Sequence, residues 1–254
     1  MNIMKIFKTV LPHLARLCLV STFINVAVKS WLEWEDQSEF LVISWGCTQN
    51  TVISFLVLNL VGHVTSVALV LAKLCVGKAC LSLFCLSLIQ GIAYQEILER
   101  QFLFRLFLLL GSLLLVVAES LVQEKSAYGG VPSLGENISK KYFLLAGRIL
   151  MLFMFETVLT FETSVNQIIQ NVVGTLLMLS FTIGYKTRLS ACLMVGWLTV
   201  LNFSQNAWWK VNDNEARRII QYEFFQWISV VGGLLMMVSL GAGGVSMDEQ
   251  KKKW

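Results

Sequence analysis

Two lysines near the end of the chain have a spacing that indicates a recognition signal. Lys251 and Lys252 stand fourth and third from Trp254, after a short polar stretch, 243–250. Lysines at these positions have the form of a dilysine retrieval signal, which coat proteins bind on cytosolic tails. Charge alone is explained as well by a basic end on the cytosolic side of a membrane. Both interpretations stay open on these residues alone.

A carboxylate inside an apolar stretch is a second candidate for chemistry. Glu156 lies in the middle of residues 144–162, where an ionisable side chain costs about 2.5–3.5 kcal/mol at the centre of a membrane helix. Such a carboxylate can receive a free amino terminus in a charge-assisted hydrogen bond. The structural alternative is an ion pair with Arg148, two turns earlier on nearly the same helix face. Glu162, at the end of the stretch, is a further candidate, and a solvated charge explains it equally well.

Polar side chains in or at the ends of other apolar stretches are weaker candidates for contact with a ligand. Hydrogen bonds between helices explain most groups of this kind, and a lone histidine is better explained by packing than by metal binding. The residues concerned are Asn59, His63, Gln90, Gln170 and Asn171. Asn59, Gln170 and Asn171 are retained as candidates for the binding site.

The sequence contains no arrangement typical of an enzyme. It has no glycine-rich phosphate loop, no HExxH motif and no nucleophile elbow. Its six cysteines are scattered without the spacing of metal ligands, and small packing residues account for them. We therefore expect a protein that is not an enzyme, that needs no cofactor or metal, and that does not bind nucleic acid.

Composition predicts an all-α polytopic membrane protein. Hydrophobic residues make up 56% of the 254 residues, charged residues 14%, and the mean hydropathy is +0.68. A soluble domain of this size cannot bury so much apolar surface. Eight stretches are long enough to cross a hydrocarbon core of about 30 Å, with seven spans as the main competitor. The stretches are 11–31, 52–72, 76–95, 102–118, 144–162, 168–184, 188–205 and 224–241.

Charges between these stretches predict their orientation. With the N-terminus in the cytosol, most lysines and arginines fall on the cytosolic side, and the acidic segment 33–39 falls on the lumenal side, as the positive-inside rule requires. Both termini then face the cytosol, where a dilysine signal is accessible to coat proteins. The glycosylation sequon at Asn137 also falls in the cytosol, and we expect it to stay unmodified.

Short matches in the same order predict an internal duplication. Arg16 matches Arg148, Asn59 matches Asn171, and Gly111 matches Gly232, each with its neighbours. An even number of spans per repeat preserves orientation, so two four-helix repeats related by an axis along the membrane normal are expected, with a cavity at their interface. The predicted domains are a first repeat with a short N-terminal tail, a cytosolic linker, a second repeat and a cytosolic tail, over 1–128, 129–143, 144–242 and 243–254.

The stretches 11–19, 170–175, 184–187 and 241–254 closely resemble the Surfeit locus protein 4 family, the endoplasmic-reticulum cargo receptors of animals and fungi. The resemblance covers nearly the whole chain in order, and its C-terminal block is the most specific part. Each predicted repeat also looks like the smaller DoxX-type four-helix membrane fold, with its arginine in the first helix.

The resemblance implies a receptor that cycles between the endoplasmic reticulum, the ER–Golgi intermediate compartment and the Golgi. Such receptors bind soluble secretory proteins in the lumen, often by short motifs at the cargo's new N-terminus, enter coated vesicles and return by the dilysine tail. The implied partners are cargo, vesicle coat proteins and membrane lipids, and self-association into a homo-oligomer stays open.

One departure from the family bears on the binding site. Where the family's first helix carries an acidic pair before a glycine, this chain has Asn25, Val26 and Ala27. The repeat alignment places Glu156 opposite Ile24, next to that pair, so the carboxylate of the cavity is expected to have moved to the other repeat. A transporter of lipids or small solutes and a DoxX-like membrane oxidoreductase subunit remain the alternatives to a receptor.

Overall fold

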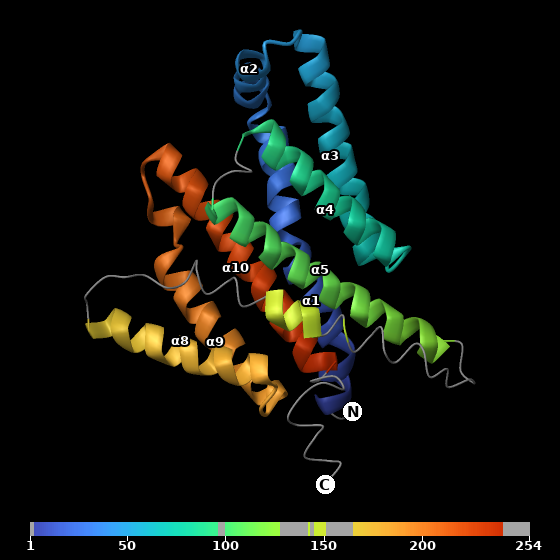
Figure 1. Cartoon of the computed structure of the whole chain (residues 1–254), viewed down its shortest axis with the longest axis vertical. Coiled ribbons are helices and arrows are strands. Elements are labelled where there is room, and N and C mark those ends of the chain that lie inside the picture. The colour runs from blue at the N-terminus through green and yellow to red at the C-terminus, as the bar shows by residue number, and fades with distance from the viewer. Residues whose placement is uncertain (1–2, 96–99, 128–141, 143–144, 151–164, 241–254) are drawn as a thin grey trace.

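The computed structural model describes residues 3–95, 100–127, 142, 145–150 and 165–240, and these residues form helices and turns without any strand. Figure 1 shows the helices as one elongated bundle. The helices are α1 (Ile3–Leu32), α2 (Trp34–Trp45), α3 (Gln49–Leu71), α4 (Val76–Ala93), α5 (Arg100–Ala127), α8 (Val165–Ile183), α9 (Thr187–Gln205), the 3₁₀ turn η3 (Trp208–Lys210) and α10 (Asn214–Leu240). Residues 145–150 are also helical.

Long apolar helices make the chain a polytopic helical membrane protein, as predicted. Within the described residues, five helices are long and apolar enough to cross a membrane, in α1, α3, α4, α5 and α10, and a shorter apolar helix covers Ile168–Ile183. Most of the predicted span 144–162 lies outside the described residues, so the number of eight spans stays a prediction.

Helical segments with charged side chains fall between the predicted spans, among them α2 and the start of α10. The short helix α2 carries Glu35 and Asp36 in its first turn and ends at Gly46, whose left-handed φ of 63° suits glycine. Helix α10 begins at Asn214, before the predicted start at residue 224, and its first turns carry Arg217 and Arg218. A search for apolar stretches misses such segments because their charged side chains lie outside the hydrocarbon core.

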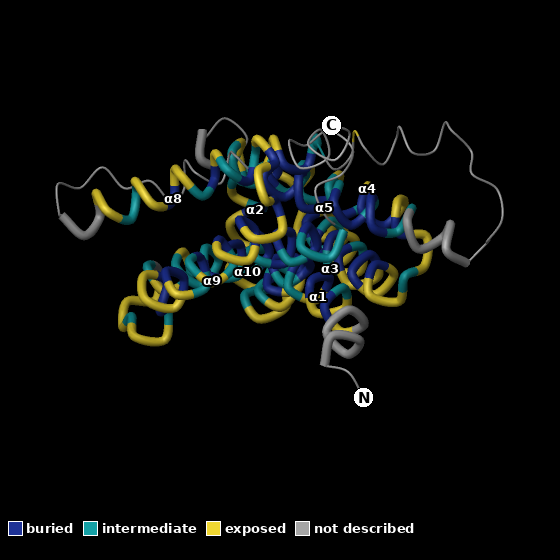
Figure 2. Tube along the Cα trace, turned by 90° about the horizontal axis from the view of Figure 1, so that it is seen from below, coloured by how far each residue is buried: buried dark blue, intermediate teal, exposed yellow. Residues whose placement is uncertain are grey.

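The first and last helices form the centre of the bundle. α1 packs along α10 and also contacts α3, α5 and α2, while α9 packs on α10 and α8 packs on α9. Buried residues therefore gather toward the middle of the molecule, and α8 lies at its edge with exposed residues along much of its length (Figure 2). The exposed apolar side chains of the outer helices suit contact with lipid.

Glycines allow two close helix crossings. A methyl group at Gly232 of α10 would lie 2.5 Å from the backbone nitrogen of Leu19 and 2.7 Å from the carbonyl oxygen of Ala15 in α1. A methyl group at Gly111 of α5 would lie 3.2 Å from the carbonyl oxygen of Gly147. The sequence duplication matches Gly111 to Gly232 and Ala15 to Gly147, so equivalent residues make both crossings. This is the arrangement expected of two repeats, whose bounds stay a prediction.

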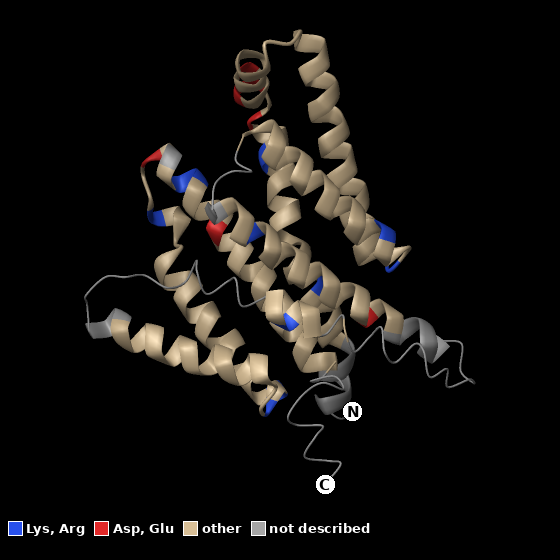
Figure 3. Ribbon diagram, viewed as in Figure 1, with Lys and Arg blue, Asp and Glu red and all other residues tan. Residues whose placement is uncertain are grey.

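The two ends of the bundle differ in charge (Figure 3). The acidic residues of α2 lie at one end, and the basic turns between α3 and α4 and between α8 and α9 lie toward the other. These turns carry Lys73 and Lys78, and Lys186 and Arg188. The first residue of α1 and the last residue of α10 lie at the basic end (Figure 1), which agrees with the orientation expected from the sequence.

Candidate functional site

A pocket opens between α1, α4, α5 and α10, near the end of the bundle that carries α2. Its volume is about 220 Å³. The apolar part of its wall consists of Phe23, Val26, Phe102, Leu106, Leu109 and Ile219, and hydroxyl and amide groups come from Thr22, Ser87, Gln90 and Tyr222. A concave apolar site with a few convergent polar groups is the usual form of a binding site.

A glycine shapes one wall of this pocket. The ring of Phe102 in α5 lies so close to α4 that a methyl group at Gly91 would be 2.1 Å from its Cζ atom. Gly91 is buried, and both residues line the pocket. The absence of a side chain at residue 91 therefore lets the aromatic ring lie against the backbone of α4.

Three cations line the pocket: Lys29 of α1, Arg105 of α5 and Arg218 of α10. Arg218 forms ion pairs with Glu33 at 3.1 Å and with Asp36 at 3.2 Å. Arg105 lies 3.4 Å from Glu223, and its guanidinium lies 5.5 Å from the ring centre of Tyr222. Lys29 lies 4.0 Å from Glu33. These pairs join the α2 end of α1 and the start of α5 to the start of α10.

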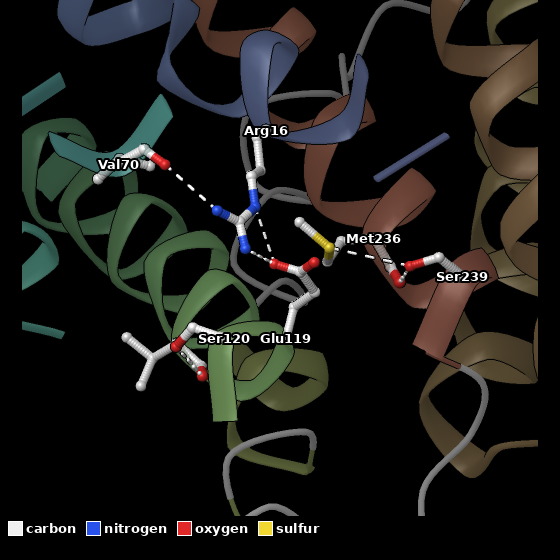
Figure 4. A network of polar contacts seen from close by, with 7 residues as sticks. Arg16, Val70, Glu119, Ser120, Met236 and Ser239 are labelled. Atoms are coloured by element: carbon white, nitrogen blue, oxygen red, sulfur yellow. Dashed lines mark hydrogen bonds and ion pairs between the residues drawn. The ribbon is translucent and has the colours of Figure 1, made fainter. Parts of the chain in front are cut away.

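A second polar cluster lies between α1, α3 and α5 (Figure 4). The Arg16 Nε atom donates a hydrogen bond of 2.8 Å to Glu119 of α5, and its Nη2 atom forms an ion pair with the same carboxylate. Its Nη1 atom donates to the carbonyl oxygen of Val70 in α3, at 3.3 Å. Arg16 and Glu119 are only 1% and 3% exposed. This enclosed cluster joins three helices, and we assign it a structural role.

The structure does not gather the predicted site residues into one site. Asn59 is buried in α3, where its carbonyl oxygen lies 3.0 Å from Nδ1 of His63, and neither residue lines the pocket. In α8, Gln170 accepts a weak hydrogen bond of 3.4 Å from Gln205, and the carbonyl oxygen of Asn171 accepts one from Thr175. Gln90, the weaker candidate, does line the pocket. Glu156, Glu162, Lys251 and Lys252 lie outside the described residues.

Sequence reasoning missed the three cations that line the pocket. It did not consider Lys29, and it counted Arg105 and the mixed segment 210–223, which contains Arg218, only as charges on the lumenal side. A signal was nevertheless present, because Lys29 and Arg105 fall inside the predicted spans 11–31 and 102–118. Ionisable residues inside spans are rare and mark candidate functional sites.

Comparison with known proteins gives consistent matches over the whole chain. The model of the SURF4 family matches residues 1–254. A Surfeit locus protein 4 homolog of Drosophila melanogaster is 46% identical over 254 residues, which are 100% of this chain and 94% of that protein. The ER-derived vesicles protein ERV29 of Saccharomyces cerevisiae is 32% identical over 247 residues, which are 96% of this chain and 78% of that protein. No solved structure matches the chain.

Proposed function

Because this chain belongs to the SURF4 family, we propose that it is a cargo receptor of the early secretory pathway. In this proposal it binds soluble secretory proteins in the lumen of the endoplasmic reticulum and promotes their export to the Golgi in coated vesicles. It then returns from the Golgi and the ER–Golgi intermediate compartment. Its partners are the cargo, the vesicle coat and the lipids around its spans.

The observation that carries this proposal is the full-length family match combined with a pocket at the end of the bundle expected to face the lumen. The name of the yeast relative, ER-derived vesicles protein, indicates the compartment from which its vesicles form. A receptor needs a binding site open to the lumen. The pocket supplies such a site if the acidic end of the bundle faces the lumen, as the positive-inside rule requires.

Return to the endoplasmic reticulum is proposed to depend on Lys251 and Lys252. Their spacing from Trp254 is that of a dilysine signal, and the basic end of the bundle, where α10 ends, is the one expected in the cytosol. Vesicle coat proteins are the partners that such a signal engages.

Glu156 is proposed to receive the amino terminus of the cargo, with Glu162, Asn59, Gln170 and Asn171 as further candidates for contact. A buried carboxylate and an ammonium group form a charge-assisted hydrogen bond. The substitution Glu156→Gln keeps the size of the side chain and removes its charge, so cargo capture in cells should fall while receptor abundance stays normal. Pairing with Arg148 predicts a loss of the receptor itself instead.

Photo-crosslinking in intact cells tests the receptor function at the pocket. A photoreactive amino acid is placed at Gln90, which lines the pocket, and as a control at Val61, which is 53% exposed on the outer face of α3. The proposal predicts that Gln90 captures soluble secretory proteins and that Val61 does not. A transporter of lipids or small solutes predicts adducts of those molecules at Gln90 and no secretory protein, which would contradict the proposal.

A further inference from the structure

The charge inside the pocket has one sign. Among the described residues that line it, every charged side chain is basic: Lys29, Arg105 and Arg218. Their carboxylate partners, Glu33, Asp36 and Glu223, are not part of the lining. The acids therefore pair with the cations without lining the pocket, and the charged side chains that a bound molecule can contact there are basic.

Two of these cations, Arg105 and Lys29, are held by ion pairs that permit exchange, whereas Arg218 is held more closely by Glu33 and Asp36. The pairs of Arg105 with Glu223 and of Lys29 with Glu33 are long, at 3.4 and 4.0 Å, and all of the carboxylates are partly exposed to solvent. Exposed pairs of this kind contribute little to stability. A carboxylate that enters the pocket can therefore replace Glu223 at the Arg105 guanidinium, and it loses less hydration energy there than at an enclosed site.

The size and the apolar wall of the pocket limit which chemical group can lie next to the carboxylate in the bound molecule. Its volume of about 220 Å³ is below the range of about 300–1,000 Å³ that is typical of sites for drug-sized molecules. Phe23, Phe102 and Leu106 form an apolar surface beyond the cations. The space therefore suits an anionic group together with one short apolar group, as neighbouring side chains of an extended peptide provide.

We propose that this pocket binds an acidic side chain and the apolar side chain next to it on an extended segment of the cargo. This inference rests on the proposed receptor function and adds the chemical class of the recognised segment. The carboxylate lies between Lys29, Arg105 and Arg218, and the apolar side chain packs against Phe23 and Phe102. Lysine in place of the acidic residue is repelled by the same three cations.

Binding of matched peptides to the full-length protein tests this selectivity. The protein is reconstituted in nanodiscs of zwitterionic phosphatidylcholine, so that the lipid carries no net charge. The probes are three short peptides with a central leucine–X–valine, in which X is glutamate, glutamine or lysine. The amino end is free and the carboxyl end is blocked in all three peptides, so they differ in charge only at X, and a neutral dye at the carboxyl end reports fluorescence anisotropy. We expect the glutamate peptide to bind about tenfold more tightly than the glutamine peptide and the lysine peptide to bind most weakly.

Two substitutions with opposite expected effects assign the selectivity to the pocket. Arg105→Gln removes one cation and should weaken binding of the glutamate peptide by about tenfold. Glu223→Gln removes the competing acid and should tighten it. If the Arg105–Glu223 pair served only to hold α5 against α10, both substitutions would weaken binding. Arg217→Gln is the matched control, because Arg217 is exposed, lies over the ring of Trp208 and does not line the pocket.

The outcomes separate this inference from the receptor function. Equal affinity for the three peptides, or the same change in affinity for Arg105→Gln and Arg217→Gln, overturns the acidic selectivity. Absence of binding by any of the three peptides overturns it as well. The receptor function is tested independently by crosslinking from Gln90. Capture of secretory proteins in that experiment does not depend on the charge of the recognised segment.

Discussion

At the residue scale, buried charge among the described residues is concentrated in a few side chains that do not line the pocket. Arg16, Arg148 and Glu119 are at most 3% exposed, and the two arginines are the largest fully buried side chains among the described residues. An ion in a low-dielectric interior is stable only when other charges and polar groups compensate it. Arg16 meets this condition through Glu119 and the carbonyl oxygen of Val70.

Removing the charge of Glu119 should therefore destabilise the protein strongly. Glu119→Gln leaves the guanidinium of Arg16 in the bundle without its carboxylate partner, and the loss of one member of a buried pair costs about 3–5 kcal/mol. We expect a lower melting temperature in detergent and a lower abundance in cells. Glu39→Gln is the control, because Glu39 is exposed on α2. Equal melting temperatures for the two variants would refute the structural role of the pair.

Sequence reasoning predicted only part of this chemistry. It identified Arg16 through the resemblance and Arg148 as a partner of Glu156, but it did not connect Arg16 with Glu119. The two residues are 103 positions apart, and their contact depends on how α1 packs against α5. The hydrophobic pattern of a helix predicts which of its faces is buried. It does not predict which other helix packs against that face.

At the element scale, the long apolar helices were predictable, whereas the helix α2 and the early start of α10 were not. Each of α1, α3, α4 and α5 covers most of one predicted span, because about 20 apolar residues form a helix across a bilayer. The start of α10 has polar contacts of Arg218 with Glu33 and Asp36, whereas α2 packs through Leu41 against Val52 and Leu56 of α3 and Ala93 of α4. Because the contacts of Arg218 join distant segments, the pocket they border was also hidden in the sequence.

The crossing of α1 and α10 should fail when Gly232 gains a side chain. Even Gly232→Ala places a methyl group 2.5 Å from the backbone of Leu19, and backbone atoms cannot move aside as a flexible side chain can. Overpacking of this kind costs about 1–3 kcal/mol, which a thermal melt of the purified protein should detect. Gly196→Ala in α9 has open space around the new methyl group and should be neutral or stabilising. Similar melts for both variants would show that the close approach is unimportant.

At the scale of the whole molecule, the proposed orientation places the pocket and the C-terminal tail on opposite sides of the membrane. The acidic α2 end and the basic end of the bundle are opposite, and the positive-inside rule assigns them to the lumen and the cytosol. In the proposed orientation, α10 ends on the cytosolic side, which is the side on which coat proteins bind a dilysine signal.

Location in cells tests this connection. Changing both Lys251 and Lys252 to serine should move the protein from the endoplasmic reticulum toward the Golgi or the cell surface. Lys253→Ser removes a charge from the same tail at a different spacing and should leave the location unchanged. If imaging finds the double variant in its usual place, the lysines act only as a basic end.

The central claim is that cargo binds in this pocket. The most direct test measures secretion in cells whose receptor carries a larger side chain that fills the pocket. Ser87 lines the pocket and Ser54 is exposed on α3, and each hydroxyl donates a hydrogen bond to the carbonyl oxygen four residues earlier. Cells that lack the protein receive the wild type, Ser87→Phe or Ser54→Phe, and secreted soluble proteins are measured together with receptor abundance. The account predicts that Ser87→Phe fails to restore secretion at normal abundance, whereas Ser54→Phe restores it. Full secretion with Ser87→Phe at normal abundance would contradict a cargo site in this pocket.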